Sequence, residues 1–140
     1  MKDIVDLIGR LFVALIFAYE AFDTIFYYKQ TKMMLTEYGV LWRQDLLMGL
    51  AIFTLVFGCL LLISGYRIGL GVILLLAYWI PATLIVHDFW TFEEPQRRVE
   101  AMIFMKNLAI VGGLLIIWVN GAGRYSIKRL FATTRVRGVN

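Results

Sequence analysis

The most constraining feature of the sequence is a set of four long apolar segments. A bilayer has a hydrocarbon core about 30 Å thick, which a helix crosses with roughly 20 residues. Apolar segments of this length cover residues 5–27, 46–63, 68–86 and 102–119. They are too continuous for the strands of a membrane barrel, in which apolar and polar residues alternate. We therefore predict an all-α, polytopic membrane protein whose 140 residues form one domain, a bundle of four transmembrane helices.

Composition excludes several other classes of protein. The chain is 61% hydrophobic and 17% charged, whereas a soluble domain is about 45–50% apolar and about 25% charged. The single cysteine, Cys59, and the single histidine, His87, exclude an internal disulfide, a thiolate zinc site, an iron–sulfur cluster and haem held by two histidines. No motif for binding nucleotides or nucleic acids is present in the sequence. We therefore predict no metal site, no covalently bound cofactor and no nucleic-acid partner.

The distribution of Lys and Arg predicts how the bundle is oriented in the membrane. Seven of these residues lie on the side that holds both termini and the turn at 64–67, against five on the side of the loops 28–45 and 87–101. Including the acidic residues gives a formal charge of about +5 on the first side and about −1 on the second. We expect both termini in the cytoplasm, with the basic tail 120–140 against anionic lipid of the cytoplasmic leaflet.

Polar side chains within the apolar segments point to a site. Each ionisable residue at the centre of a membrane helix costs about 2.5–3.5 kcal/mol on insertion scales. Glu20 and Asp23 lie one turn apart on the same face of the first helix. Lys106 and Asn107 reach a similar depth in the last helix, and His87 ends the third segment. We expect these five side chains to meet in the outer half of the bundle.

Three interpretations of this polar cluster are open. In the first, Lys106 neutralises Glu20 or Asp23, and the ion pairs join the helices. In the second, Asp23 and Lys106 extend to the membrane interface. In the third, the cluster closes one end of an apolar ligand cavity that suits a quinone, whose carbonyl oxygens need a donor such as His87 or Lys106, while Glu20 or Asp23 relays protons. For His87, a plain interfacial position is the alternative to ligand binding.

Other residues have structural interpretations. Arg10 is expected to reach lipid phosphate or to donate to backbone carbonyls near 121–125. Pro81 is expected to kink its helix, which tilts His87 toward the bundle or fits the packing. Aromatic residues near the end of the third segment are expected to form an interfacial belt: Tyr78, Trp79, Trp90 and Phe92. Glycines within the segments are expected to allow close helix approach: Gly9, Gly49, Gly58, Gly112 and Gly113.

A series of residues along the chain matches a family pattern. It includes Gly49 and Gly58 in the second segment, Gly65-Tyr66-Arg67 at the turn, His87 and Lys106-Asn107. Its remaining motif residues are Arg10, Gly112, Gly113, Gly121, Gly123, Arg124, Tyr125 and Ser126. In this order and spacing the chain resembles the DoxX family of small four-helix membrane proteins over about residues 4–127. The resemblance implies a four-helix bundle with both termini inside. It also implies association with quinone or redox systems, because the family is named for a subunit of a thiosulfate:quinone oxidoreductase.

The leading hypothesis is an integral membrane subunit or partner of a respiratory, quinone-linked oxidoreductase system. It places a quinone or lipid site in the outer half of the bundle. Because the chain has no electron carrier of its own, a non-catalytic role beside other membrane subunits or further copies of the chain is favoured. The alternative is a structural or assembly protein with no chemistry of its own. A transporter or channel is a third hypothesis, which requires an oligomer because four helices make a poor pore.

Overall fold

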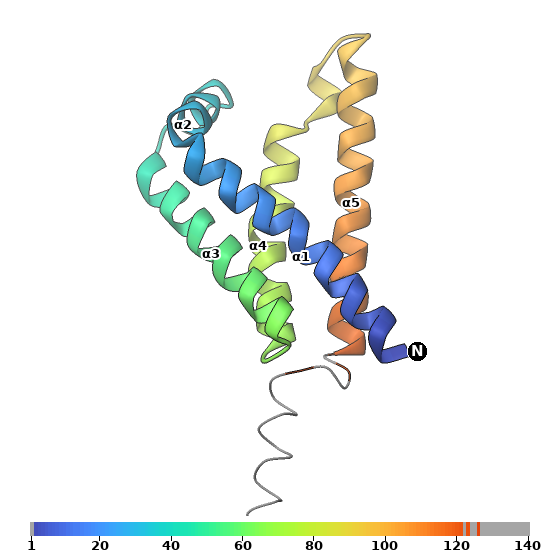
Figure 1. The fold of residues 1–140 in the computed structure, drawn as a ribbon. Helices are drawn as coiled ribbons and strands as arrows, with labels where there is room; N and C mark the ends of the chain where they lie inside the picture. Colours follow the sequence, from blue (N-terminus) through green and yellow to red (C-terminus); the bar gives the residue numbers. More distant parts are fainter. Residues whose placement is uncertain (1, 122, 124–125, 127–140) are drawn as a thin grey trace, which may run out of the picture.

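The computed structural model describes residues 2–121, 123 and 126, and within them the chain is helical without strands. The prediction of an all-α protein is confirmed for these residues. Arg124, Tyr125 and the tail beyond Ser126 lie outside the described residues. Figure 1 shows the helices in order: α1 (Lys2–Phe26), α2 (Tyr28–Glu37), α3 (Gln44–Ser64), α4 (Ile68–Val86), the 3-10 helix η1 (Phe89–Thr91) and α5 (Gln96–Asn120).

Three stretches of the described chain are long and apolar enough to cross a membrane: α3, α4 with its extension to Thr91, and α5. The predicted segments 46–63 and 68–86 agree with α3 and α4, and α4 runs through Pro81 without interruption. α5 begins at Gln96, six residues before the predicted start, because its first turns are polar. α1 is as long as α5, but every stretch of 18 residues in it contains at least three charged side chains.

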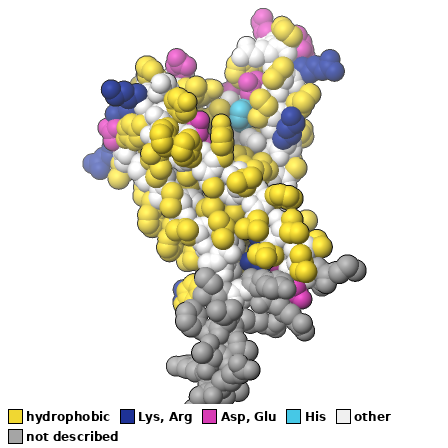
Figure 2. All heavy atoms as spheres, in the orientation of Figure 1, with side chains coloured by type: hydrophobic (Ala, Val, Ile, Leu, Met, Phe, Trp, Pro, Cys, Tyr) yellow, Lys and Arg dark blue, Asp and Glu magenta, His cyan; other side chains and the backbone are white. Residues whose placement is uncertain are grey.

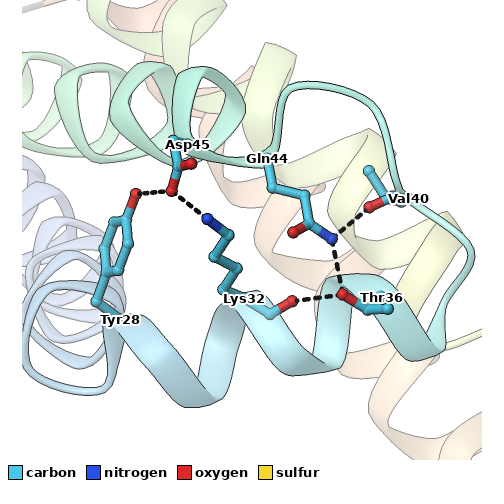
Figure 3. A network of polar contacts seen from close by, with 6 residues as sticks. All are labelled: Tyr28, Lys32, Thr36, Val40, Gln44 and Asp45. Atoms are coloured by element: carbon cyan, nitrogen blue, oxygen red, sulfur yellow. Dashed lines mark hydrogen bonds and ion pairs between the residues drawn. The ribbon is translucent and has the colours of Figure 1, made fainter.

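The segment 28–45, which we predicted to be a loop, contains the helix α2. No apolar run marks α2, although Lys, Gln, Met, Leu and Glu are all good helix formers. α2 has no buried residue, and polar contacts attach it to the start of α3. Tyr28 and Lys32 donate to the Asp45 carboxylate at 3.0 and 2.5 Å, while the Gln44 amide donates to Thr36 Oγ1 and the Val40 carbonyl, each at 2.8 Å (Figure 3).

The core lies between α1, α3, α4 and α5. On α1 the buried residues recur every three or four positions and form one stripe, Arg10, Ala14, Phe17, Ala21 and Thr24. The apolar part of this stripe packs against Leu55, Cys59 and Leu62 of α3, Val72, Leu75 and Trp79 of α4, and Leu114 and Ile117 of α5. Large apolar side chains also cover much of the outer surface (Figure 2), as expected for helices that face lipid.

α3 and α4 approach most closely near the turn that joins them, and glycine permits this contact. A Cβ atom on Gly58 would lie 2.8 Å from the Leu75 side chain, and one on Gly71 would lie 3.0 Å from Leu61 Cβ. Toward α2 the two helices diverge (Figure 1). We call the two ends of the bundle the hairpin end, which holds the α3–α4 turn, and the α2 end, which holds α2 and η1.

The other glycines do not all have the role expected of them. A Cβ atom added at Gly9, Gly49 or Gly112 would have no described atom within 4 Å, so the prediction of close helix approach is wrong there. Gly113 makes an ordinary contact with Val13 of α1, at 3.8 Å from the Cβ position. Close approach is therefore confirmed at Gly58, and its partner on α4 is Gly71.

Arg10 lies at the hairpin end and is fully buried. Its Nε donates to Asp6 Oδ2 at 3.0 Å and its Nη1 contacts the carbonyl oxygen of Leu62, at the end of α3, at 3.5 Å. The expectation that Arg10 reaches lipid phosphate is therefore wrong, since no part of its side chain is exposed. Gly123 of the tail packs on the same group, because a Cβ atom there would lie 3.3 Å from Asp6 Oδ2.

Replacing Gly58 by alanine tests the α3–α4 contact. We expect Gly58→Ala to lower the free energy of unfolding in detergent by about 1–3 kcal/mol, because the added methyl group overlaps the buried Leu75 side chain. Gly112→Ala is the matched control, with open space at its Cβ position, and should stay within about 1 kcal/mol of the parent protein. Equal stability of the two variants would contradict the packing described.

Replacing Arg10 by methionine tests the buried ion pair. We expect Arg10→Met to destabilise the protein by about 3–5 kcal/mol, because the Asp6 carboxylate loses its described cationic partner. The double variant Asp6→Asn/Arg10→Met leaves no such carboxylate and should regain part of the loss in thermal unfolding followed by circular dichroism. A double variant less stable than Arg10→Met would show that the two residues do not act as a pair.

Candidate functional site

A pocket of about 660 Å³ lies at the α2 end of the bundle. α1, α3 and α4 form its walls, Asn107 of α5 reaches its inner end, and α2 with residues 38–40 covers it. Figure 2 shows a hollow between two groups of atoms at this end, and His87 is one of the residues that line the pocket. The pocket exists because α3 and α4 diverge from their glycine contact (Figure 1).

The walls of the pocket are mainly apolar and reach the outer surface of the bundle. Leu47, Leu50 and Ala51 line it on α3, opposite Leu74 of α4. Further along α4, Ala77, Pro81 and Ile85 recur every four residues, line the pocket and are themselves exposed. Because exposed residues of a membrane helix face lipid, the pocket has a side opening onto the apolar surface as well as its polar end.

Two carboxylates of α1 lie at the polar end of the pocket. Glu20 is half-buried, and its Oε1 accepts a hydrogen bond from the Tyr78 hydroxyl of α4 at 2.9 Å. Asp23 is also half-buried and lines the pocket one turn further along. Its carboxylate makes no hydrogen bond or salt bridge with any residue that the structure describes. Asp23 is therefore available to a ligand.

α4 and α5 supply further polar groups. His87 Nδ1 lies 2.8 Å from Oε2 of Glu100, and both side chains are largely buried. The side-chain amide of Asn107 donates to Thr83 Oγ1 at 3.2 Å, and the backbone carbonyl of Asn107 accepts from Trp79 Nε1 at 3.3 Å. These contacts hold α5 against α4 and fix the positions of His87 and Asn107 at the pocket.

Four of the five predicted site residues line this pocket, namely Glu20, Asp23, His87 and Asn107. Lys106 does not. Its side chain is exposed and forms no salt bridge within the described part of the chain. Adjacent residues of a helix point about 100° apart, and here Asn107 is directed toward Thr83 of α4 while Lys106 is directed outward. The predicted ion pair between Lys106 and Glu20 or Asp23 is therefore wrong.

Several residues of the site were not predicted from the sequence. We expected Tyr78 and Trp79 in an interfacial belt, but Tyr78 bonds Glu20 and Trp79 is buried, with its ring 5.1 Å from Phe17. Glu100 was expected in a loop. It precedes Asn107 by seven residues, or two helical turns, and therefore shares its face of α5. An earlier start for the last helix would have revealed this pairing.

The electrostatic character of the site is acidic. The residues that line the pocket include Glu20 and Asp23 but no Lys or Arg among those described. Near the cover, partial burial raises the pKa of Tyr38, and the charges of Glu100 and Asp88 act in the same direction. Within the described residues, no group of three or more His, Cys, Asp or Glu side chains is placed to hold a metal ion. The site is therefore suited to a ligand that is neutral or positively charged.

Comparisons with known proteins agree with the resemblance found in the sequence. The model of the DoxX family matches residues 5–88, and that of the SURF4 family matches residues 50–130. The protein named inner membrane protein YqjF, from Escherichia coli (strain K12), is 26% identical over 130 residues, which cover 93% of this chain and 94% of the relative. No solved structure matches the chain.

Proposed function

The chain belongs to the DoxX family, and from this premise we propose that it binds the head group of a quinone within a bacterial inner membrane, as a subunit or partner of a quinone-linked oxidoreductase system. The observation that carries the proposal is the pocket, whose apolar side opening leads to a polar end. The bacterial inner membrane is proposed because a relative of similar length is named for it.

The size and chemistry of the pocket support an amphiphilic ligand. Its volume of about 660 Å³ lies within the range of small-molecule sites, roughly 300–1,000 Å³. An alkyl tail suits the apolar walls and the exposed residues Ala77, Pro81 and Ile85 of α4, while a ring with two oxygen substituents suits the polar end. Glu20 and the His87–Glu100 pair supply acid–base side chains beside such a ring.

In this proposal the chain positions the quinone and exchanges protons with it, and a partner exchanges electrons with it. One cysteine and one histidine give the chain too few ligands for a haem with two histidines or an iron–sulfur cluster. A redox partner, as another membrane subunit, would therefore exchange electrons with the quinone. The other proposed partner is a second copy of the chain, which would make the protein a homo-oligomer.

We further propose that α1 crosses the membrane and that the protein has four spans with both termini in the cytoplasm. The charges that distinguish α1 from the other long helices are directed inward, since Arg10 is fully buried beside Asp6 and Glu20 bonds Tyr78. The outer face of α1 is apolar, with Phe12, Leu15 and Phe22 all more than half exposed. The Lys and Arg distribution supports this orientation.

One observation favours the alternative, a structural or assembly protein. The polar contacts at the pocket join helices in pairs without any ligand: Glu20–Tyr78 joins α1 to α4, and Asn107–Thr83 joins α4 to α5. If these contacts serve only assembly, substitutions such as Glu20→Gln should lower folded yield together with any activity. Under the quinone proposal, ligand binding falls while folded yield is kept.

Filling the pocket tests the quinone proposal. Purified protein in lipid nanodiscs should bind a decyl-benzoquinone saturably in isothermal titration. Ala82→Phe places a large side chain in the pocket and should weaken binding at least about tenfold, which is about 1.4 kcal/mol. Ala109→Phe is the matched control, since Ala109 lies on the exposed face of α5 away from the pocket, and it should bind as the parent does.

The same titrations decide against the proposal in two cases. One is the absence of saturable binding to a parent protein that is folded by circular dichroism and monodisperse by size-exclusion chromatography. The other is equal affinity in Ala82→Phe and the parent protein, because binding would then occur elsewhere.

Labelling of single cysteines tests the proposed topology. In a Cys59→Ala background, Glu93→Cys should react with a membrane-impermeant thiol reagent in intact spheroplasts, whereas Tyr66→Cys should react only after the membrane is opened. Both positions are exposed, so their difference reports the side of the membrane. The reverse pattern would place the termini outside, and a reaction at both positions would contradict the span count.

A further inference from the structure

We infer that the pocket selects the reduced hydroquinone over the oxidised quinone. This inference rests on the proposed function and specifies which redox form of the ligand the site holds. The two forms share a ring and a tail. They differ in hydrogen bonding, because quinone carbonyls only accept hydrogen bonds, whereas hydroquinone hydroxyls donate them as well. The balance of free donors and acceptors around the polar end therefore decides between them.

The donors beside Glu20 and Asn107 are already engaged within the protein. The Tyr78 hydroxyl donates to Glu20 Oε1 at 2.9 Å, and the Thr24 hydroxyl donates to the Glu20 carbonyl at 2.8 Å. Trp79 Nε1 donates to the Asn107 carbonyl at 3.3 Å. The Asn107 amide uses one of its two hydrogens on Thr83, at 3.2 Å. The lining residues that the structure describes include no Lys or Arg to supply a cationic donor.

The acceptors, in contrast, are largely free. An ionised carboxylate offers about four acceptor positions and no donor. The Asp23 carboxylate lines the pocket without a hydrogen bond or salt bridge to any described residue, and the structure gives Glu20 Oε2 no partner within the same residues. Two carboxylates of α1, one turn apart, thus offer acceptors at the polar end.

The His87–Glu100 pair adds to this excess of acceptors. Nδ1 of His87 lies 2.8 Å from Oε2 of Glu100, and an ionised carboxylate at that distance requires the proton to be on Nδ1. In a neutral imidazole, Nε2 is then an acceptor. The hydroxyls of Tyr38, Thr54 and Thr83 both donate and accept, so they do not distinguish the two forms.

The two ligand forms therefore meet different surroundings. Hydroquinone hydroxyls satisfy Asp23, Glu20 or His87 with charge-assisted or neutral hydrogen bonds. Quinone carbonyls place partial negative charge beside the same carboxylates and leave them unsatisfied in a partly buried site, which is unfavourable. The acidic site thus distinguishes the forms by hydrogen bonding rather than by shape.

Three probes with the same decyl tail test the inference: the benzoquinone, its hydroquinone and the dimethyl ether of the hydroquinone, titrated anaerobically into the protein in nanodiscs. We expect the hydroquinone to bind about tenfold more tightly than the quinone. The dimethyl ether, which has no donor, should bind no better than the quinone. In Asp23→Asn the amide supplies donors, so the preference should fall toward onefold. Lys106→Gln, outside the pocket, should keep it.

Each other outcome has a definite meaning. Quinone that binds as tightly as hydroquinone, or more tightly, overturns the inference and leaves the proposed function standing. A preference that survives both Asp23→Asn and a second variant, Glu20→Gln, also overturns it, because the carboxylates would not be its source. If no probe binds, the proposed function fails together with the inference. The dimethyl ether comparison needs no variant, so it holds even where a substitution prevents folding.

Discussion

The close contact of α3 and α4 at Gly58 and Gly71 determines the form of the bundle. Two helices that touch so closely near their connecting turn, and that cross at an angle, must separate with distance from it. The separation at the α2 end creates space that side chains of α1 and α5 fill only in part. The pocket is the part left open, and the polar residues at its end come from the helices that border this space.

The burial of the charged side chains of α1 is the second feature that determines the form of the bundle. A helix with Asp6, Arg10, Glu20 and Asp23 would be a poor membrane helix if these side chains faced lipid. Arg10 instead joins Asp6 and the end of α3 at one end of the bundle, and Glu20 bonds Tyr78 near the other. The stripe that holds Arg10 also carries Ala14, Phe17 and Ala21 of the core, and the half-buried Glu20 and Asp23 flank it. One face of α1 therefore serves packing and the site together.

The length of the apolar segments was sufficient to predict α3, α4 and most of α5, because a run of about 20 apolar residues has few possible structures other than a membrane helix. It was insufficient for α2, which is held by polar contacts to Asp45 and Gln44 that join residues distant in sequence. The same holds for the site. Depth along the helices predicted that four polar side chains meet, namely Glu20, Asp23, His87 and Asn107. It did not predict the direction of Lys106, which depends on the rotation of α5 about its axis. The partners of Glu20 and His87, which are Tyr78 and Glu100, depend on tertiary packing.

The side opening along α4 has a consequence for how strongly a ligand must bind. α2 covers the polar end, while Ala77, Pro81 and Ile85 reach the apolar surface. A lipophilic molecule dissolved in the bilayer therefore reaches the pocket by lateral diffusion without passing through water. Partition into lipid sets its concentration at the pocket, and this concentration greatly exceeds its concentration in water. Weak intrinsic affinity is then enough for occupancy, and rapid exchange with the lipid phase follows from the same weakness.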